Sequence, residues 1–465
     1  MLRPTLSCSL VLAAACAGCA DAPAPTPTKA PAPPGYHVTD GFLRDPEGRA
    51  LLLRGMNLGS QKQAPYLDFD GVADYQRVKE AWGMNVVRFV MTWAAVEPKE
   101  GVYDDAYLDE VAKRMDWARK AGIFVVLDMH QDVYGEGFAV GGGDGAPLWS
   151  CDAAKYKTFV PNPTKWFLNS VSPEVTACWD HFWSTDALRA QYVEGWRRVA
   201  KRLSGYKDVI VGFDPMNEPY WGSHSLFSFE TDLLQPLYND VVAAVRGERP
   251  EWIAFLEPGS NRNIGIATSL TPFAYPDVVY SPHSYDRDAE SGMGFDAAHR
   301  AAVISNATDL AGEAQMLGAG LWIGEYGGMS DSPGITDYMD AEYAAFAAVA
   351  AGTTYWSYSK GGSYSVLDAD GMEKTTLLAA LVRPWPERVA GSPVSYGFDS
   401  TTTTFTLSYK PDPKIAAPTV IRIPERAYPN GYKVECGGCT TERAPGELHV
   451  VKPQAGASVT VTVHP

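Results

Sequence analysis

Between residues 51 and 358, short apolar runs of the sequence alternate with longer amphipathic stretches. The apolar runs are Leu51–Asn57, Asn85–Phe89, Ile123–Asp128, Val209–Phe213, Trp252–Leu256, Val278–Ser281, Leu321–Gly324 and Thr353–Tyr358. The helix-like stretches between them include Asp105–Ala121, Ala187–Leu203, Ala297–Leu317 and Tyr338–Ala351. Parallel strands joined by helical crossovers give this alternation, so eight such units predict an α/β fold, a closed (β/α)8 TIM barrel. An open doubly wound sheet is disfavoured, because the glycine-rich phosphate turn expected after its first strand does not follow Leu53.

A different pattern begins near Trp385. Helical periodicity stops there, and alternating threonine-rich runs follow at Thr401–Tyr409, Thr419–Ile423 and Ser458–Val463. These runs predict a small C-terminal β-sandwich over residues 385–465, behind a barrel domain over residues 36–384. The sequence leaves open whether the sandwich only caps the barrel or binds carbohydrate or membrane.

The N-terminal residues have the pattern of an export signal. Arg3 precedes an apolar run from Leu10 to Ala15, and small residues surround Cys16 and Cys19. We therefore expect residues 1–20 to be the signal peptide of a secreted protein, since the run is too short to span a bilayer. The same residues resemble a bacterial lipoprotein signal with a lipid anchor, although neither cysteine has leucine three positions before it. Residues 21–35 are rich in proline and fit an extended linker.

Four cysteines lie beyond that segment, and an even number in an exported chain suggests disulfide bonds. We expect one bond between Cys151 and Cys178 across a long loop, and another between Cys436 and Cys439 in a Cys-Gly-Gly-Cys turn. The alternative for the second pair is half of a zinc site. No further Cys or His pair lies nearby in the sequence to complete it.

The charge balance bears on the class of partner. The formal net charge is −16 and there is no basic cluster, so a polyanion such as nucleic acid would be repelled. The chain also holds 13 tryptophans, which suit a sugar-binding cleft but also fill cores. A neutral or weakly charged substrate and a monomeric protein are expected.

Polar or aromatic residues follow or end most of the predicted strands. Because the carboxyl ends of barrel strands line one mouth, these residues are candidates for an active site. They are Arg88 at the end of the second strand, His130 after the third, Asn217 and Glu218 after the fourth, His283 and Tyr285 after the sixth, Glu325 after the seventh, and Trp356 in the eighth.

Two of these residues are glutamates, which suits the hydrolysis of a glycosidic bond with retention. One carboxylic acid protonates the leaving oxygen and one carboxylate attacks the anomeric carbon, with the carboxyl groups about 5 to 5.5 Å apart. Glu218 is expected to be the acid/base and Glu325 the nucleophile, with no cofactor or metal. Arg88 and Tyr285 would stabilise the Glu325 anion, whose charge would keep Glu218 protonated. Asn217 would bind the sugar 2-hydroxyl, and Trp356 would form the floor under the ring.

The segments around Arg88, Asn217-Glu218, His283 to Tyr285 and Glu325 resemble glycoside hydrolase family 5 of the clan A barrels. The resemblance covers roughly residues 36 to 384. Within that family, residues 128–134 and 145–149 look like the endoglycoceramidases, which cut the β-bond between oligosaccharide and ceramide in glycosphingolipids. The resemblance implies a glucose site built by His130, Asp132, Asn217, Glu325 and Trp356, with Lys62 as a weaker match. It also implies transient contact with a lipid surface.

A ceramide leaving group needs an apolar groove beside the sugar cleft. The long connection from Met129 to about Ser184 and the residues Trp221, Phe227 and Phe229 are expected to wall it. A cellulase or another family 5 β-glucosidase would share the site residues but need a polar cleft on both sides of the bond. A non-catalytic binding protein on a degenerate barrel is the remaining alternative, and the presence of both glutamates argues against it.

Overall fold

The computed structural model describes residues 35–59, 71–451 and 457–465. The expected signal peptide, nearly all of the expected linker and Lys62 therefore lie outside the described residues. No helix in the described part of the chain is both long and apolar enough to cross a bilayer.

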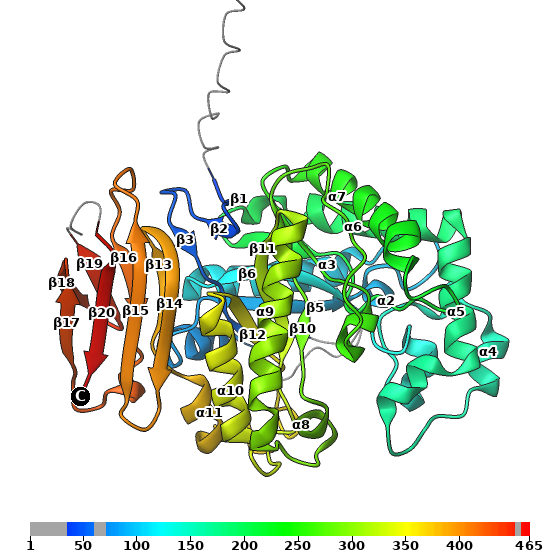
Figure 1. The fold of residues 1–465 in the computed structure, drawn as a ribbon. Coiled ribbons are helices and arrows are strands. Elements are labelled where there is room, and N and C mark those ends of the chain that lie inside the picture. Colours follow the sequence, from blue (N-terminus) through cyan, green and yellow to red (C-terminus); the bar gives the residue numbers. More distant parts are fainter. Residues whose placement is uncertain (1–34, 60–70, 452–456) are drawn as a thin grey trace, which may run out of the picture. The chain divides into compact units, whose positions relative to one another are not determined.

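The predicted (β/α)8 barrel is confirmed, and its strands follow one another around the barrel in chain order (Figure 1). All pairings in this sheet are parallel, and β9 and β10 pair with successive parts of β11 to close it. The strands are β4 (Arg54–Gly59), β5 (Val86–Thr92), β6 (Phe124–His130), β7 (Ile210–Asp214), β8 (Ile253–Leu256), β9 (Val278–Tyr280), β10 (His283–Ser284), β11 (Gly320–Tyr326) and β12 (Gly352–Tyr355).

Helices cover the outside of the barrel between successive strands. Each long helix buries one apolar face; α3, for example, begins after the N-cap Asp104 and ends at Gly122, whose φ of 67° suits glycine. The helices are α1 (Val72–Gln76), η1 (Arg77–Ala81), α2 (Trp93–Val96), α3 (Asp105–Ala121), α6 (Asp186–Arg202), η5 (Ser204–Tyr206), η6 (Glu230–Leu234), α7 (Gln235–Glu248), η7 (Ser260–Ile264), α8 (Arg287–Ser291), η8 (Ala297–His299), α9 (Arg300–Leu317), α10 (Ile335–Ala348) and α11 (Thr375–Leu381).

The long connection after β6 is a small helical subdomain. It contains η2 (Glu136–Gly141), η3 (Leu148–Ser150), α4 (Ala153–Thr158), η4 (Trp166–Val171) and α5 (Pro173–Ser184). A disulfide joins Cys151, directly after η3, to Cys178 in α5. Trp179 and Trp183 are buried, so these two rings are part of the apolar core.

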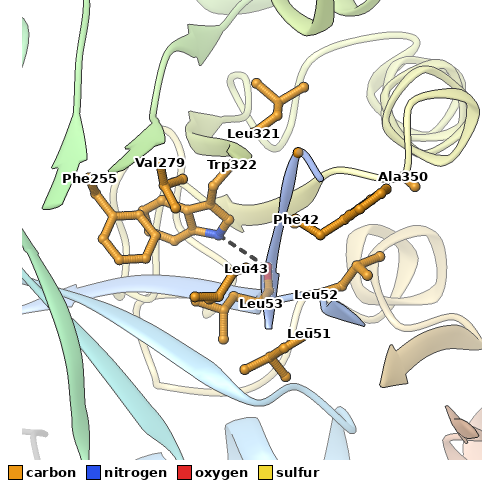
Figure 2. A pocket seen from close by; sticks show the side chains of 12 residues that line it. Phe42, Leu43, Leu51, Leu52, Leu53, Phe255, Val279, Leu321, Trp322 and Ala350 are labelled. Carbon is orange, nitrogen blue, oxygen red and sulfur yellow. Dashed lines mark hydrogen bonds between the residues drawn. The ribbon is translucent and has the colours of Figure 1, made fainter. Parts of the chain in front are cut away.

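Three short N-terminal strands close the floor of the barrel. Leu43, Leu51 and Leu53 pack with Val279 and Trp322 in an apolar cluster at the barrel bottom. Figure 2 shows these side chains around a cavity of about 20 Å³, with the Trp322 indole donating to the Leu53 carbonyl oxygen over 3.1 Å. The opposite mouth, where the strands end, is left for the functional site.

The C-terminal β-sandwich is also confirmed, and its two sheets share one apolar core. One sheet has the order β1 (His37–Thr39), β2 (Phe42–Arg44), β3 (Ala50–Leu51), β13 (Trp385–Val389), β16 (Thr419–Arg422), β19 (Glu447–Val451) and β18 (Thr440–Ala444). The other has the order β14 (Gly391–Asp399), β15 (Thr404–Pro411), β20 (Val459–His464) and β17 (Lys433–Gly437). A short helix, η9 (Glu425–Ala427), follows β16, and Cys436 is bonded to Cys439.

The N-terminal strands change the domain organisation expected from the sequence. Leu51 pairs with Arg388, so β3 joins the sheet of the C-terminal domain although its residues were assigned to the barrel. The apolar run Leu51–Asn57 is correspondingly not one strand but the end of β3 and most of β4. Apolar composition could not show this break, because both strands are buried.

Candidate active site

The residues expected at the barrel mouth come together, but several lie inside strands rather than after them. Arg88 is the third residue of β5, and Glu325 is the sixth of seven residues in β11. His130 ends β6, and His283 begins β10. Trp356, expected within the eighth strand, directly follows β12. A polar side chain therefore does not mark the end of a strand here, because the backbones of Arg88 and Glu325 still pair with the neighbouring strands.

Arg88 is fully buried and binds four carboxylates. Its Nη2 lies 2.9 Å from Asp128 and 3.0 Å from Asp214, and its two terminal nitrogens reach Glu257 at 2.8 Å and Glu325 at 2.7 Å. These charges keep the pKa of Arg88 well above its ordinary value, although burial alone would lower it. Such a buried guanidinium fixes the carboxylates around it in one geometry.

Glu325 points into the mouth between two hydrogen-bond donors. Arg88 Nη1 contacts its Oε1, and the Tyr285 hydroxyl donates to its Oε2 over 2.9 Å. Burial, Glu325 and the neighbouring Tyr364 raise the pKa of Tyr285 well above its ordinary value, so this hydroxyl keeps its proton. The geometry expected for the Arg88 and Tyr285 contacts to Glu325 is therefore present.

Glu218 lies on the opposite side of the same opening, with 24% of its side chain exposed. Its backbone has a φ of 39°, in the left-handed region, and its amide nitrogen donates to Glu257 Oε2 over 2.8 Å. Such strain persists only when the surroundings hold it, and it is common at functional sites. The Asn263 amide and the His283 ring both contact Glu218 Oε1 at 2.8 Å.

The two glutamates are close together. A carboxylate oxygen of Glu218, one of Glu325 and a ring nitrogen of His283 all lie within 4.8 Å of one another. Inverting glycosidases separate their carboxyl groups by roughly 6.5 to 9.5 Å to admit a water molecule. The spacing therefore agrees with the short separation predicted for a retaining enzyme.

The order of acidity in this structure is the reverse of the expected one. Burial would raise the pKa of Glu218, but the hydrogen bond and charge of His283 outweigh it and lower that pKa. Burial raises the pKa of Glu325 despite the nearby His283 and Arg88. The expectation that the charge of Glu325 keeps Glu218 protonated was wrong because it left out His283. Burial would lower the pKa of His283, but Glu257 and Glu325 raise it well above its ordinary value.

The expected sugar-binding residues line the adjoining part of the mouth. The Trp356 ring stacks on His130 with a centroid distance of 4.9 Å and an interplanar angle of 8°. His130 Nδ1 lies 2.8 Å from Asp128, and its Nε2 lies 3.5 Å from Asp132. The Asn217 side chain accepts from Arg88 and donates to the Gln131 carbonyl, which leaves one N–H of its amide for a ligand.

Four polar residues that hold this site were missed from the sequence. Asp128 orients both Arg88 and His130, and Asp214 contacts Arg88 and Glu257. Glu257 contacts Arg88, His283 and the backbone amide of Glu218. The Asn263 side-chain amide donates a hydrogen bond to Glu218 Oε1. Glu257 directly follows the buried strand β8, so the rule that found Glu218 could have found it. Asn263, inside η7, gave no such signal.

The residues expected to wall an apolar groove separate into two groups. Phe229 is buried against Trp183, with ring centroids 5.1 Å apart, and so cannot line a groove. Trp221 is partly buried and stacks on Tyr220. Phe227, in contrast, is 78% exposed.

Two sets of side chains in the described part of the chain have donor atoms near enough to share an ion. One is Glu218, His283 and Glu325, and the other is His130, Asp132 and Asp144. Burial raises the pKa of both Asp132 and Asp144.

The chain matches known proteins along most of its length. Residues 45–362 match the family model described as cellulase (glycosyl hydrolase family 5), and residues 383–463 match a glycoside hydrolase family 5 C-terminal domain. Endoglycoceramidase I of Rhodococcus hoagii is 28% identical over 92% of this chain and 86% of its own length. A solved structure of endo-glycoceramidase II from Rhodococcus sp. in complex with ganglioside GM3 is 32% identical, covers 92% of this chain and all of that chain, and has a TM-score of 0.81. Another holds a lactosyl-enzyme intermediate, with a TM-score of 0.79.

Proposed function

The chain belongs to glycosyl hydrolase family 5, and from this we propose that it is a retaining endo-β-glycosidase that releases oligosaccharide from ceramide in glycosphingolipids. Solved relatives at 32% identity bear the name endo-glycoceramidase, one of them bound to ganglioside GM3. The observation that carries the proposal is that a carboxylate oxygen of Glu218 and one of Glu325 lie within 4.8 Å of each other at the barrel mouth.

Glu325 attacks the anomeric carbon in the first step. Arg88 and Tyr285 hold its carboxylate oxygens, so it reaches the sugar without reorientation. As the glycosidic bond breaks, Glu218 gives a proton to the leaving oxygen of ceramide. The products of this step are a glycosyl ester on Glu325 and free ceramide.

Water completes the reaction in the second step. Glu218, now ionised, takes a proton from a water molecule that attacks the same anomeric carbon, and Glu325 leaves as a carboxylate. Two inversions give net retention. His130, Asp132, Asn217 and Trp356 bind the sugar ring, and Glu257 and Asp128 hold the charged residues around it.

The side of the site that receives the leaving group is apolar at its rim. Because Glu218 protonates the leaving oxygen, ceramide must lie on its side of the opening. Ile264 is 52% exposed and follows Asn263, which contacts Glu218. The segment from Pro219 to Phe229 packs on the same loop, where Ser260 donates to the Pro219 carbonyl, and it carries the exposed Phe227.

The location and assembly of the protein are also proposed. Residues 1–20 and the two disulfide bonds support export, because disulfides persist in oxidising compartments. Lipidation of Cys16 or Cys19 would anchor the protein at the cell surface. We propose a monomer that contacts lipid surfaces transiently, since a single chain carries all of the site residues.

Substrate comparison tests the function. The enzyme should release intact oligosaccharide and ceramide from a fluorescent glycosphingolipid and act poorly on a soluble cello-oligosaccharide. A preference for the cello-oligosaccharide would instead support the glucanase alternative.

Two variants test the apolar rim. Ile264→Ser and Phe227→Ser should slow glycosphingolipid hydrolysis about tenfold but spare short aryl glycosides, because burial of each methylene contributes about 0.8 kcal/mol. Met316→Ser, at an exposed position on α9, is the matched control. Equal losses on both substrates would show that these residues only support the barrel.

A further inference from the structure

An unusual surface lies on the helical subdomain after β6. Five apolar side chains within twelve residues are exposed there: Val160, Trp166, Phe167, Leu168 and Val171. Trp166, Phe167 and Leu168 are consecutive in η4, so they point to all sides of this short helix, and each is about 40% exposed. Exposed apolar side chains that gather in one place mark a surface that contacts a partner or a membrane.

The exposure is not the result of a poorly packed segment. Below these residues, the Asn169 amide donates to the Gly141 carbonyl over 2.8 Å and accepts from the Asn162 nitrogen over 2.7 Å. Phe159 is buried with its ring 5.0 Å from that of Phe138. The disulfide between Cys151 and Cys178 joins the residues just before α4 to α5, which runs beside α4 (Figure 1). The residues below the surface are therefore well packed, and the exposed side chains stand on an ordered support.

The same surface has a charge opposite to that of the whole protein. Lys155, Lys157 and Lys165 are the only residues between residues 153 and 173 that carry a charge at pH 7, whereas the chain carries a formal net charge of −16. None of the three is buried. Lysines among exposed tryptophan, phenylalanine and leucine are typical of surfaces that lie in the headgroup region of a membrane, where ammonium groups meet anionic headgroups and rings enter the acyl boundary.

The surface belongs to the face of the barrel that holds the active site. The subdomain begins directly after His130, and the backbones of Asp132 and Asp144 are hydrogen-bonded to each other. Its helix α5 also holds the loop after Glu218, since Asp180 accepts from the Ser223 nitrogen over 2.7 Å. A membrane bound here would lie beside the proposed entry of the leaving group.

We propose that Val160, Trp166, Phe167, Leu168 and Val171, with the three lysines, form a docking surface for lipid bilayers that carry anionic headgroups. The rest of the protein is acidic and is repelled by such a bilayer, so this surface also sets the orientation in which the enzyme approaches it. The inference deepens the proposed function by naming where the enzyme meets its lipid substrate.

Co-sedimentation of the full chain with glycolipid-free vesicles tests the docking surface. The wild type should bind vesicles of phosphatidylcholine with one-fifth phosphatidylserine more tightly than vesicles of phosphatidylcholine alone. The triple variant Trp166→Ser/Phe167→Ser/Leu168→Ser should lose at least about tenfold in affinity for both. Lys155→Gln/Lys157→Gln/Lys165→Gln should lose about tenfold or more for the anionic vesicles only, and this loss should shrink at high salt.

A matched variant removes three exposed apolar side chains elsewhere. Val102→Ser/Met316→Ser/Val394→Ser should bind vesicles as the wild type does. Unchanged turnover of a soluble aryl glycoside shows that each variant is folded. The proposal is overturned if the wild type does not bind the vesicles or if the two surface variants bind them as well as the wild type does. It is also overturned if the matched variant loses as much affinity as the surface variants. Failure of the proposed function would be seen separately, as no cleavage of glycosphingolipid in detergent micelles.

Discussion

Arg88 and His283 decide how charge is distributed in the active site. Arg88 alone faces four buried carboxylates, and His283 lies between Glu218 at 2.8 Å, Glu257 at 3.2 Å and Glu325 at 3.6 Å. One proton therefore belongs to the pair of His283 and Glu218 rather than to either residue. When it resides on Glu218, the pair is ready to protonate a leaving group.

The pH dependence should show this shared proton. The pair loses it as pH rises through the elevated pKa of His283, so the alkaline limb of kcat/KM should lie above pH 6.5, the ordinary value for histidine. In His283→Asn, Glu218 must hold the proton with its own carboxyl, and the limb should move to lower pH. The pH profile of kcat/KM on an aryl glycoside with a poor leaving group gives the position of the alkaline limb in the wild type and in His283→Asn. His224→Asn, at the surface, is the control, and an unmoved or raised limb in His283→Asn would contradict the shared proton.

Replacement of the nucleophile should separate turnover from binding. Glu325→Gln keeps the contacts that hold the sugar but loses the attacking oxygen, so turnover should fall by about three orders of magnitude or more. Titration calorimetry with the released oligosaccharide should show affinity within a few-fold of the wild type. Glu47→Gln, at an exposed position, should leave both unchanged. A variant with more than about a tenth of the wild-type rate would exclude Glu325 as the nucleophile.

At the scale of elements, periodicity was enough to find eight strands and the main helices, including α3 to the residue. It misplaced strand ends, because Arg88 and Glu325 are polar side chains on backbones that still pair in the barrel. The site residues found from the sequence lie in the last part of a strand or within a few residues after it. Asn263 could not be predicted as a site residue, because its position depends on the conformation of the loop before it. The prediction that Phe229 lines a groove was wrong, because apolar character does not distinguish a core residue from a surface residue.

Strand β13 carries a buried carboxylate that should contribute to stability. Burial would raise the pKa of Glu387, but Arg422 and Arg388 outweigh it and lower that pKa to about 2. Relative to 4.5 in the unfolded chain, the shift corresponds to about 3 kcal/mol. Glu387 makes its full contribution to the free energy of unfolding above pH 4.5, and this contribution is lost as the pH falls toward 2.

Glu387→Gln should therefore lower the free energy of unfolding by about 3 kcal/mol at pH 7, since it leaves two arginines without their buried partner. Urea unfolding at pH 7, 5 and 3 measures the difference, which should shrink at pH 3. Glu425→Gln in η9, where the carboxylate is exposed, should change stability little. A difference between Glu387→Gln and the wild type that did not depend on pH would show that shape, not charge, matters at this position.

For the whole molecule, the C-terminal sheets are part of the barrel's support. Tyr343 and Ala347 of α10 belong to the same apolar core as Trp385 and Leu407 of the sandwich. β3 pairs with β13, and the residues just before β4 close the barrel floor. The β-sandwich could be predicted from its threonine-rich strands. The core and sheet that it shares with the barrel domain could not, because they join residues from the two ends of the described chain.

Truncation after Pro384 should therefore prevent folding instead of releasing an active barrel. The shortened chain would expose the edge of β3 and the apolar face of α10. We expect insoluble protein, or soluble protein without cooperative unfolding and without aryl glycosidase activity. Val394→Ser, which alters only an exposed position of β14, should fold normally. A soluble, active truncation would show that the sandwich is a separable module.

The pairing of β3 with β13 also sets an order of events during synthesis. Leu51 leaves the ribosome about 340 residues before its partner Arg388. At 5 to 20 residues per second, this delay is roughly 20 to 70 s. During this time β3 and the leucines of the barrel floor beside it have no partner strand. The nascent chain therefore stays open and accessible to chaperones until translation is nearly finished.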